Sequence, residues 1–121
     1  MQQPPVLNEV LIAELRDIMG SDFYTLVKSY RQDGRQRLAA LHEAVREGHM
    51  DGIRQQAHSF KGSSGNLGAL RVSALCLEME QLAREEQLDT ADDRLAELEQ
   101  AFEESCQALD RQAAGTQTAT P

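Results

Sequence analysis

The sequence predicts an all-α protein, an antiparallel up-down four-helix bundle with a short capping helix at its N-terminal end. Only five of the 121 residues are aromatic, and the three prolines lie at the ends of the chain, a composition unusual for a β-sheet protein. Apolar residues recur at intervals of three and four, the spacing of a buried helix face. Long amphipathic helices joined by short loops bury these faces most simply in such a bundle.

A single domain is expected over residues 1–112. A chain of this length buries about two thirds of the surface that it exposes when unfolded, so its stability requires neither disulfides nor metal ions. Helices are expected at about 8–19, 22–47, 51–67, 70–86 and 91–112, and residues 113–121 are expected to form a disordered tail.

The first of these helices has a start signal and a stop signal. Asn8 is a suitable N-cap and Gly20 a suitable end. Between them Leu11, Leu15 and Ile18 form one apolar stripe, so the helix is expected to cover one end of the bundle.

The second helix is predicted to stop at Gly48. Gly34 lies on its apolar face, where the missing side chain would permit close contact with another helix. Its other inward residues are predicted to be Phe23, Leu26, Val27, Tyr30, Leu38, Leu41 and Val45.

The remaining helices follow the same logic. Asp51 is the expected cap of the third, which ends near Gly68, and the link to the fourth is so short that the two must run antiparallel. Thr90 and Asp93 resemble a capping box that opens the fifth. The expected inward residues are Ile53, Ala57, Phe60, Ser64 and Leu67 in the third helix, Val72, Leu75, Cys76, Met79, Leu82 and Ala83 in the fourth, and Ala91, Leu95, Leu98, Phe102, Cys106 and Leu109 in the fifth.

Composition also limits the partners and the compartment. The formal net charge of −8 repels phosphate backbones and anionic lipid, so nucleic acids and membrane surfaces are poor partners. No run approaches the length of a membrane span, and no signal segment opens the chain. Both cysteines fall on inward faces, where free thiols behave as small apolar groups in a reducing compartment. A cytoplasmic protein is expected.

The third helix carries the residues that point to a function. At about 100° per residue, Arg54, His58, Lys61 and Gly65 lie roughly 120° away from the inward line, so His58 faces solvent. Glycine inside a helix costs about 1 kcal/mol relative to alanine, so Gly62 and Gly65 require a reason. Their small surface would let another molecule approach closely. His42 and His49 are expected to be ordinary surface histidines.

An exposed neutral imidazole is a nucleophile that can accept a phosphoryl group on Nε2, and Lys61 adds positive charge one turn away. Phosphoryl transfer relies on positioning and on electrostatic stabilisation, for which one lysine is insufficient. A metal ion and an acceptor carboxylate would therefore have to come from a partner.

Residues 57–68, AHSFKGSSGNLG, resemble the signature of histidine-containing phosphotransfer (HPt) domains, in which Ala-His is usually followed three residues on by Lys-Gly. The resemblance continues through residues 75–80 on the next helix, and the five-helix plan covers about residues 7–112. The chain is similar to HPt proteins that stand alone in bacteria.

This resemblance implies roles for individual residues. His58 would be phosphorylated on Nε2, Lys61 would stabilise the phosphoryl charge, and Gly62 and Gly65 would form the surface on which a receiver domain docks. Glu80 lies at a position from which family members can hydrogen-bond the imidazole, which would hold Nδ1–H and leave Nε2 free. Two alternatives remain open, that Glu80 belongs to an acidic outer face and that Lys61 is only a solvated charge.

Arg54 lies on the same face as His58. It would either touch the receiver domain or remain a solvated charge.

The resemblance also implies the reaction and the partners. HPt proteins pass phosphoryl groups between aspartates of receiver domains, one in a hybrid sensor kinase and one in a response regulator, and have no autonomous kinase activity. The receiver supplies the aspartate and Mg²⁺, so the chain would bind no metal or nucleotide of its own. A monomer is expected.

Two other readings compete with this one. A histidine kinase dimerisation helix also carries a phosphorylated histidine on a four-helix bundle. Two observations argue against it: Ser59 stands where that family usually has an acidic residue, and 121 residues leave no room for an ATP-binding domain. A non-catalytic helical adaptor that binds or sequesters a signalling partner is the other alternative.

Overall fold

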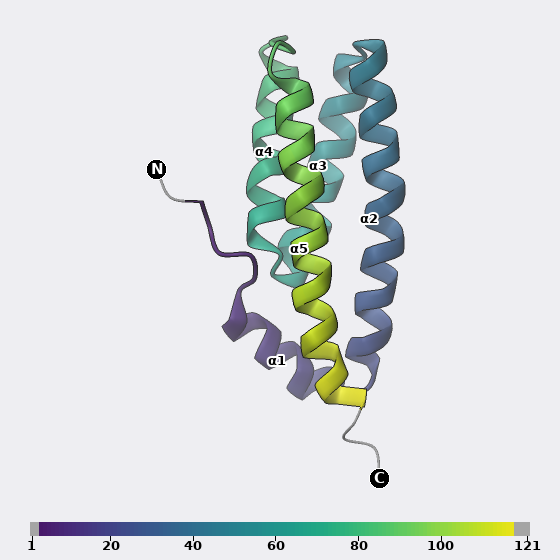
Figure 1. Ribbon diagram of the computed structural model, residues 1–121, viewed down its shortest axis with the longest axis vertical. Coiled ribbons are helices and arrows are strands. Elements are labelled where there is room, and N and C mark those ends of the chain that lie inside the picture. Colours follow the sequence, from purple (N-terminus) through teal and green to yellow (C-terminus); the bar gives the residue numbers. More distant parts are fainter. Residues whose placement is uncertain (1–2, 118–121) are drawn as a thin grey trace.

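The computed structural model describes residues 3–117, together with the side chains of residues 3–114. Within this range the regular structure is entirely helical, which confirms the prediction of an all-α helical bundle. Four long helices lie side by side, and a short one runs across one end of them (Figure 1). The helices are α1 (Glu9–Met19), α2 (Asp22–Glu47), α3 (Met50–Leu67), α4 (Leu70–Arg84) and α5 (Ala91–Gln117).

The long helices enclose one apolar core. Helix α3 packs against α2 and α4, and α5 closes the ring by packing against the same two helices. Tyr30, Phe60 and Phe102 meet at its centre with ring centroids 5.6 to 6.4 Å apart. The predicted inward residues of α3 and α5 are all buried, and in α4 only Leu82 is half-buried.

Helix α1 buries a different residue from the one expected. Ile12 is fully buried, whereas Ile18 is 81 % exposed, so the predicted stripe is wrong at Ile18. The reason is that α1 crosses the end of the bundle, where it packs against α2 and α5, so the face that it buries depends on the crossing (Figure 1). The predicted cap is confirmed, because Asn8 Oδ1 accepts a hydrogen bond from the Leu11 N–H at 3.1 Å. The Asn8 N–H donates to the Gly68 carbonyl at 2.8 Å and ties α1 to the end of α3.

Helix α3 begins at Met50, and the prediction that Asp51 caps it is wrong. The cap is His49, whose Nδ1 accepts a hydrogen bond from the Gly52 N–H at 3.0 Å. A neutral imidazole nitrogen serves here as the acceptor that Asn or Asp usually supplies. At the other end Gly68 takes a left-handed conformation, with φ of 82°, and stops the helix as predicted.

Two predicted boundaries change in the last two helices. Helix α4 ends at Arg84 instead of residue 86, because Glu86 adopts a positive φ of 54° in the turn. Helix α5 runs to Gln117, so the prediction of a disordered tail is wrong for residues 113–117. Ala113 is buried, which makes a further turn of helix favourable. Residues 118–121 lie outside the described residues.

Both cysteines are free and buried, as expected for small apolar side chains. Burial raises the pKa of the Cys76 thiol to about 12, so this thiol stays protonated at neutral pH. Over the described part of the chain, no helix combines the length and the apolar character needed to cross a membrane.

The close helix contact predicted at Gly34 is present. A methyl group built on Gly34 would lie 2.2 Å from Cε1 of Phe102, whose ring is held between Tyr30 and Phe60. We expect Gly34→Ala to destabilise the fold by about 1 to 3 kcal/mol because the ring cannot move aside without disturbing the core. Urea unfolding followed by circular dichroism measures the change.

Gly65→Ala is the matched control for this experiment, since its new methyl group meets only Ser73 Oγ at 3.6 Å. It should stabilise the fold by up to about 1 kcal/mol. Equal stabilities of the two variants would contradict the packing assigned to Gly34.

Candidate functional site around His58

The imidazole of His58 stands on the outer face of α3, as the sequence predicts. Its side chain is 68 % exposed, while its neighbours Ala57 and Phe60 are fully buried in the core. The buried line of α3 therefore anchors the helix and fixes the direction in which His58 points. A ligand or a partner has open access to this ring.

Glu80 of α4 holds the inner side of the imidazole. Its side chain is only 5 % exposed, and its Oε2 lies 3.1 Å from Nδ1 of His58. An ionised carboxylate only accepts hydrogen bonds, so Nδ1 carries the proton and donates it to Glu80. The lone pair of Nε2 is then free on the exposed side of the ring. The alternative that Glu80 belongs to the acidic outer face is wrong.

Lys61 completes the contact between the two helices. Its Nζ donates to Oε1 of Glu80 at 2.8 Å, and about a third of its side chain is exposed. Lys61 is thus an ion-pair partner of the same carboxylate that holds His58, one helical turn from the imidazole. This pairing distinguishes it from a charge that is merely solvated.

The partners of Glu80 keep its carboxyl group ionised. The hydrogen bond from Lys61 lowers its pKa most; burial opposes this effect, and the hydrogen bond from His58 adds to it. Because the pKa is lower in the folded protein, the pairing stabilises the fold at neutral pH, and this stabilisation is lost as the pH falls through the folded-state pKa.

Sequence reasoning missed Arg84 as a member of this cluster. Its Nη2 donates to Oε2 of Glu80 at 3.2 Å, so His58 and Arg84 share one carboxylate oxygen. A signal was available, because a glutamate four residues before an arginine on one helix is a common ion-pair spacing. We call His58, Lys61, Glu80 and Arg84 the histidine cluster.

Helix α2 contributes a further cation near the site. Arg37 donates from Nη1 to the hydroxyl of Ser59 at 2.5 Å and from Nε to Asp33 at 2.6 Å. This contact places a guanidinium beside the residue that follows His58, which the sequence alone did not indicate. Arg54, predicted to face a partner, is half-exposed and pairs with Asp51 on its own helix at 3.4 Å.

Gly62 and Gly65 of α3 are exposed and have room around them. A methyl group on Gly62 would meet nothing within 4 Å, and one on Gly65 would meet only Ser73 Oγ at ordinary contact distance. Packing within the chain therefore does not require glycine at either position, unlike Gly34. Glycine at these two positions lowers the stability of the helix, and packing within the fold does not explain why glycine is present there.

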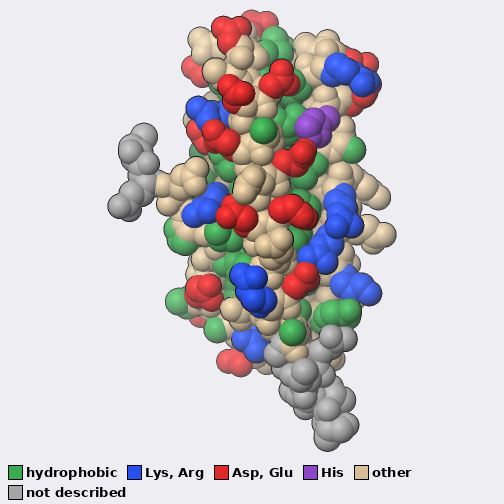
Figure 2. Space-filling view, viewed as in Figure 1, with side chains coloured by type: hydrophobic (Ala, Val, Ile, Leu, Met, Phe, Trp, Pro, Cys, Tyr) green, Lys and Arg blue, Asp and Glu red, His purple; other side chains and the backbone are tan. Residues whose placement is uncertain are grey.

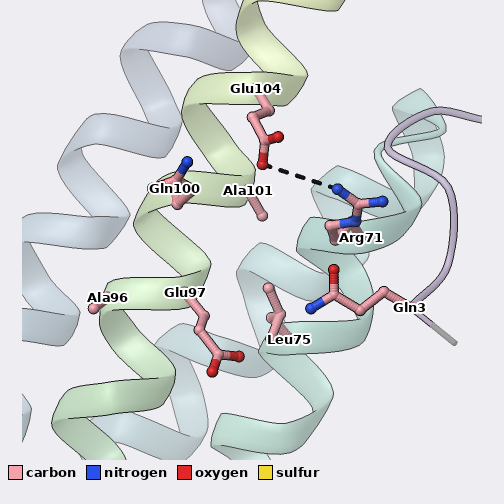
Figure 3. A pocket seen from close by; sticks show the side chains of 8 residues that line it. All are labelled: Gln3, Arg71, Leu75, Ala96, Glu97, Gln100, Ala101 and Glu104. Atoms are coloured by element: carbon pink, nitrogen blue, oxygen red, sulfur yellow. Dashed lines mark ion pairs between the residues drawn. The ribbon is translucent and has the colours of Figure 1, made fainter. Parts of the chain in front are cut away.

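A separate groove of about 350 Å³ lies between α4 and α5 (Figure 3). Leu75 and Ala101 line it, and Arg71 pairs with Glu104 across it at 3.9 Å. Nε of Arg71 also donates to the Pro4 carbonyl at 3.0 Å, which fastens the N-terminal segment at the edge of the groove. No member of the histidine cluster lines this groove.

The face of the molecule that α4 and α5 form carries many acidic side chains (Figure 2). Arginines neutralise part of this charge, since Arg94 pairs with Glu97 at 2.7 Å and approaches Glu78 at 3.9 Å. Among the described residues, no group of three or more His, Cys, Asp and Glu side chains could hold a metal ion. The histidine cluster offers a nucleophile with neighbouring cations.

Comparison with known proteins agrees with this arrangement. The family model described as Hpt domain matches residues 25–113. The crystal structure of histidine-containing phosphotransfer protein B (HptB) from Pseudomonas aeruginosa PAO1 superimposes with a TM-score of 0.87 and 29 % sequence identity, covering 93 % of this chain and 97 % of that one. A search of curated proteins finds no match.

Proposed function

We propose that this chain, which belongs to the Hpt domain family, is a histidine phosphotransfer protein of a phosphorelay. It accepts a phosphoryl group on Nε2 of His58 and passes it on. The observation that carries the proposal is the exposed imidazole whose Nδ1 faces the buried carboxylate of Glu80 at 3.1 Å. That contact presents Nε2 as the nucleophile.

Each neighbour of His58 has a role in this proposal. Glu80 positions the imidazole, and Lys61 stabilises the negative charge of the phosphoryl group from one turn away. Arg84 shares the carboxylate with His58 and adds positive charge to the same surface. These groups supply positioning and electrostatic stabilisation, which dominate catalysis of phosphoryl transfer.

The proposed partners are receiver domains, one of a hybrid sensor kinase and one of a response regulator. Each receiver supplies the aspartate that gives or takes the phosphoryl group and the Mg²⁺ that neutralises its charge. The chain acts as a monomeric cytoplasmic intermediate without kinase activity of its own. Gly62 and Gly65 allow the receiver to come close, and Arg54 contacts its rim.

The up-down antiparallel topology of the four long helices is also part of the proposal. The ring of contacts in which α2 and α4 each touch α3 and α5 supports it. The connection of two residues, Gly68 and Ala69, supports it as well, since so short a link requires α4 to turn back along α3.

Incubation with a phosphorylated receiver domain and Mg²⁺ tests the proposal. We expect an acid-labile, base-stable phosphate on this chain within the time that the receiver loses its own. No label from any receiver of a broad panel would overturn the proposal. Tight binding of a receiver without any label would favour the alternative of a non-catalytic adaptor.

Replacement of Lys61 by alanine should slow the transfer while the fold is kept. We expect the rate to fall about tenfold, which corresponds to about 1.4 kcal/mol of lost transition-state stabilisation. Rapid-quench measurement of label transfer from a phosphorylated receiver gives the rate, and circular dichroism checks the fold. Lys61→Arg is the matched control, because it retains the charge and should recover part of the rate. An unchanged rate in Lys61→Ala would reduce Lys61 to a structural partner of Glu80.

A further inference from the structure

Two hydrogen bonds between side chains join α2 to the helix that carries His58. The hydroxyl groups of Tyr30 and Ser64 lie 2.7 Å apart in the core, and Nη1 of Arg37 donates to the hydroxyl of Ser59 at 2.5 Å. Among the described residues, no other side-chain hydrogen bond or ion pair connects α2 with α3. The two serines lie one and six residues after His58, so both bonds hold the part of α3 on which the site stands.

Packing alone leaves the boundary between α2 and α3 partly open. A groove of about 310 Å³ lies there, and its lining includes Leu26 and Tyr30 of α2 and Leu67 of α3. Helix α3 has its most extensive contacts with α4 instead. Close packing therefore fixes α3 relative to α4, whereas its position relative to α2 depends more on the two hydrogen bonds.

The bond in the core is the more restrictive of the two. Tyr30 and Ser64 are both buried, so each hydroxyl has lost water and requires a partner. Apolar contacts have no preferred direction, but a hydrogen bond is satisfied only at a suitable distance and angle. This bond therefore selects one position of α3 against α2.

We propose that Tyr30 is a positioning residue, which sets α3 against α2 through Ser64 and so shapes the joint surface of both helices on which a receiver domain docks. The inference rests on the proposed function and adds to it a residue that acts on docking. A stable interface buries about 800 Å² on each partner, which is far wider than a helix of about 10 Å diameter. A receiver centred on His58 therefore also covers the neighbouring helices.

The reacting atoms are held independently of Tyr30. Glu80 of α4 accepts the hydrogen bond from the imidazole of His58, and the same carboxylate binds Lys61 of α3 and Arg84 of α4. None of these contacts involves α2. Loss of the Tyr30 hydroxyl should therefore weaken docking and leave the reaction of Nε2 with a small phosphoryl donor unchanged.

Transfer from a phosphorylated receiver to the full chain tests the inference at limiting and at saturating receiver concentrations. Tyr30→Phe keeps the aromatic ring in the core and removes only the hydroxyl. At limiting concentration it should slow transfer at least about fivefold, and at saturation the rate should stay within about twofold of normal, because KM changes and kcat does not. Phosphorylation by phosphoramidate, a small donor, should proceed at the normal rate.

Ser64→Ala removes the other partner and should reproduce the effect of Tyr30→Phe, and the double variant should be no slower than either. Ser105→Ala is the matched control, because Ser105 is also buried but donates to the Ala101 carbonyl of its own helix at 2.8 Å. It should transfer normally. Normal transfer at limiting concentration in both Tyr30→Phe and Ser64→Ala would overturn the inference, as would equal slowing in Ser105→Ala. Slower phosphorylation of Tyr30→Phe by phosphoramidate would overturn it too, because the effect would then lie at the reacting nitrogen.

The amide NMR signals of Gly62 and Gly65 report the position of α3 without a receiver. They should shift or broaden in Tyr30→Phe and in Ser64→Ala, and stay unchanged in Ser105→Ala. Unchanged signals in the first two variants would also overturn the inference. Failure of every receiver to label the unmodified chain would reject the proposed function, and this NMR comparison would still test the placement of α3.

Discussion

Replacement of His58 by alanine should abolish phosphoryl transfer to this chain from every receiver domain that labels the unmodified protein. The chain offers three histidines, and only His58 combines an exposed Nε2 with a buried carboxylate on Nδ1. We expect the label to fall at least about a thousandfold, to the background of the assay, because the imidazole whose Nε2 accepts the phosphoryl group is removed. Transfer from a labelled receiver, followed by gel autoradiography, measures the loss.

The fold should tolerate this change. The His58 side chain is mostly exposed, and Glu80 keeps the hydrogen bonds from Lys61 and Arg84 when the imidazole is removed. Exposed substitutions of this kind usually change the free energy of unfolding by no more than about 0.5 kcal/mol. A normal thermal transition of His58→Ala would therefore assign the loss of label to lost chemistry.

The other two histidines provide controls. His42 pairs with Glu99 at 2.6 Å across α2 and α5, and His49 caps α3, so His42→Asn and His49→Asn keep a polar group in each place. Both variants should accept phosphate at the normal rate. Label that persists in His58→Ala, or disappears in His42→Asn with the fold intact, would contradict the assignment of His58.

The site histidine was predictable from the sequence because its surroundings follow helical periodicity. The inward line from Ile53 to Leu67 is set by spacing alone, and the outward direction of His58 follows from it. The burial of Glu80 was harder to predict from the sequence. Its place on the α4 helix wheel is at the edge of the apolar face, and only the packing of α3 against α4 brings it under the imidazole.

The predictions that are wrong concern helix ends and the short helix α1. His49 replaces Asp51 as a cap because a side chain rarely used for capping happens to have an acceptor in the right place. Ile12 replaces Ile18 because the register of a short amphipathic helix depends on the angle at which it crosses the bundle. Tertiary contacts decide both features, and helical periodicity contains no information about them.

Replacement of Gly65 by leucine should produce a stable protein that receives phosphate poorly. Alanine already fits at this position, and leucine is a better helix former than glycine by nearly 1 kcal/mol, so the free energy of unfolding should not fall. A receiver that must bring its aspartate to Nε2 of His58 would meet the new side chain two turns along α3. We expect transfer at limiting concentrations to slow at least about tenfold, measured by label transfer over a range of receiver concentrations.

Three comparisons separate a blocked surface from other causes. Gly65→Ala should transfer within about twofold of normal, because one methyl group adds little height. Gln107→Leu places the same side chain on an exposed position of α5 and should leave transfer unchanged. Phosphorylation of Gly65→Leu by phosphoramidate should also be normal, since a small donor reaches Nε2 without docking. A Gly65→Leu variant that folds and receives phosphate from the receiver at the normal rate would remove the reason for glycine at this surface, because packing within the chain does not supply one.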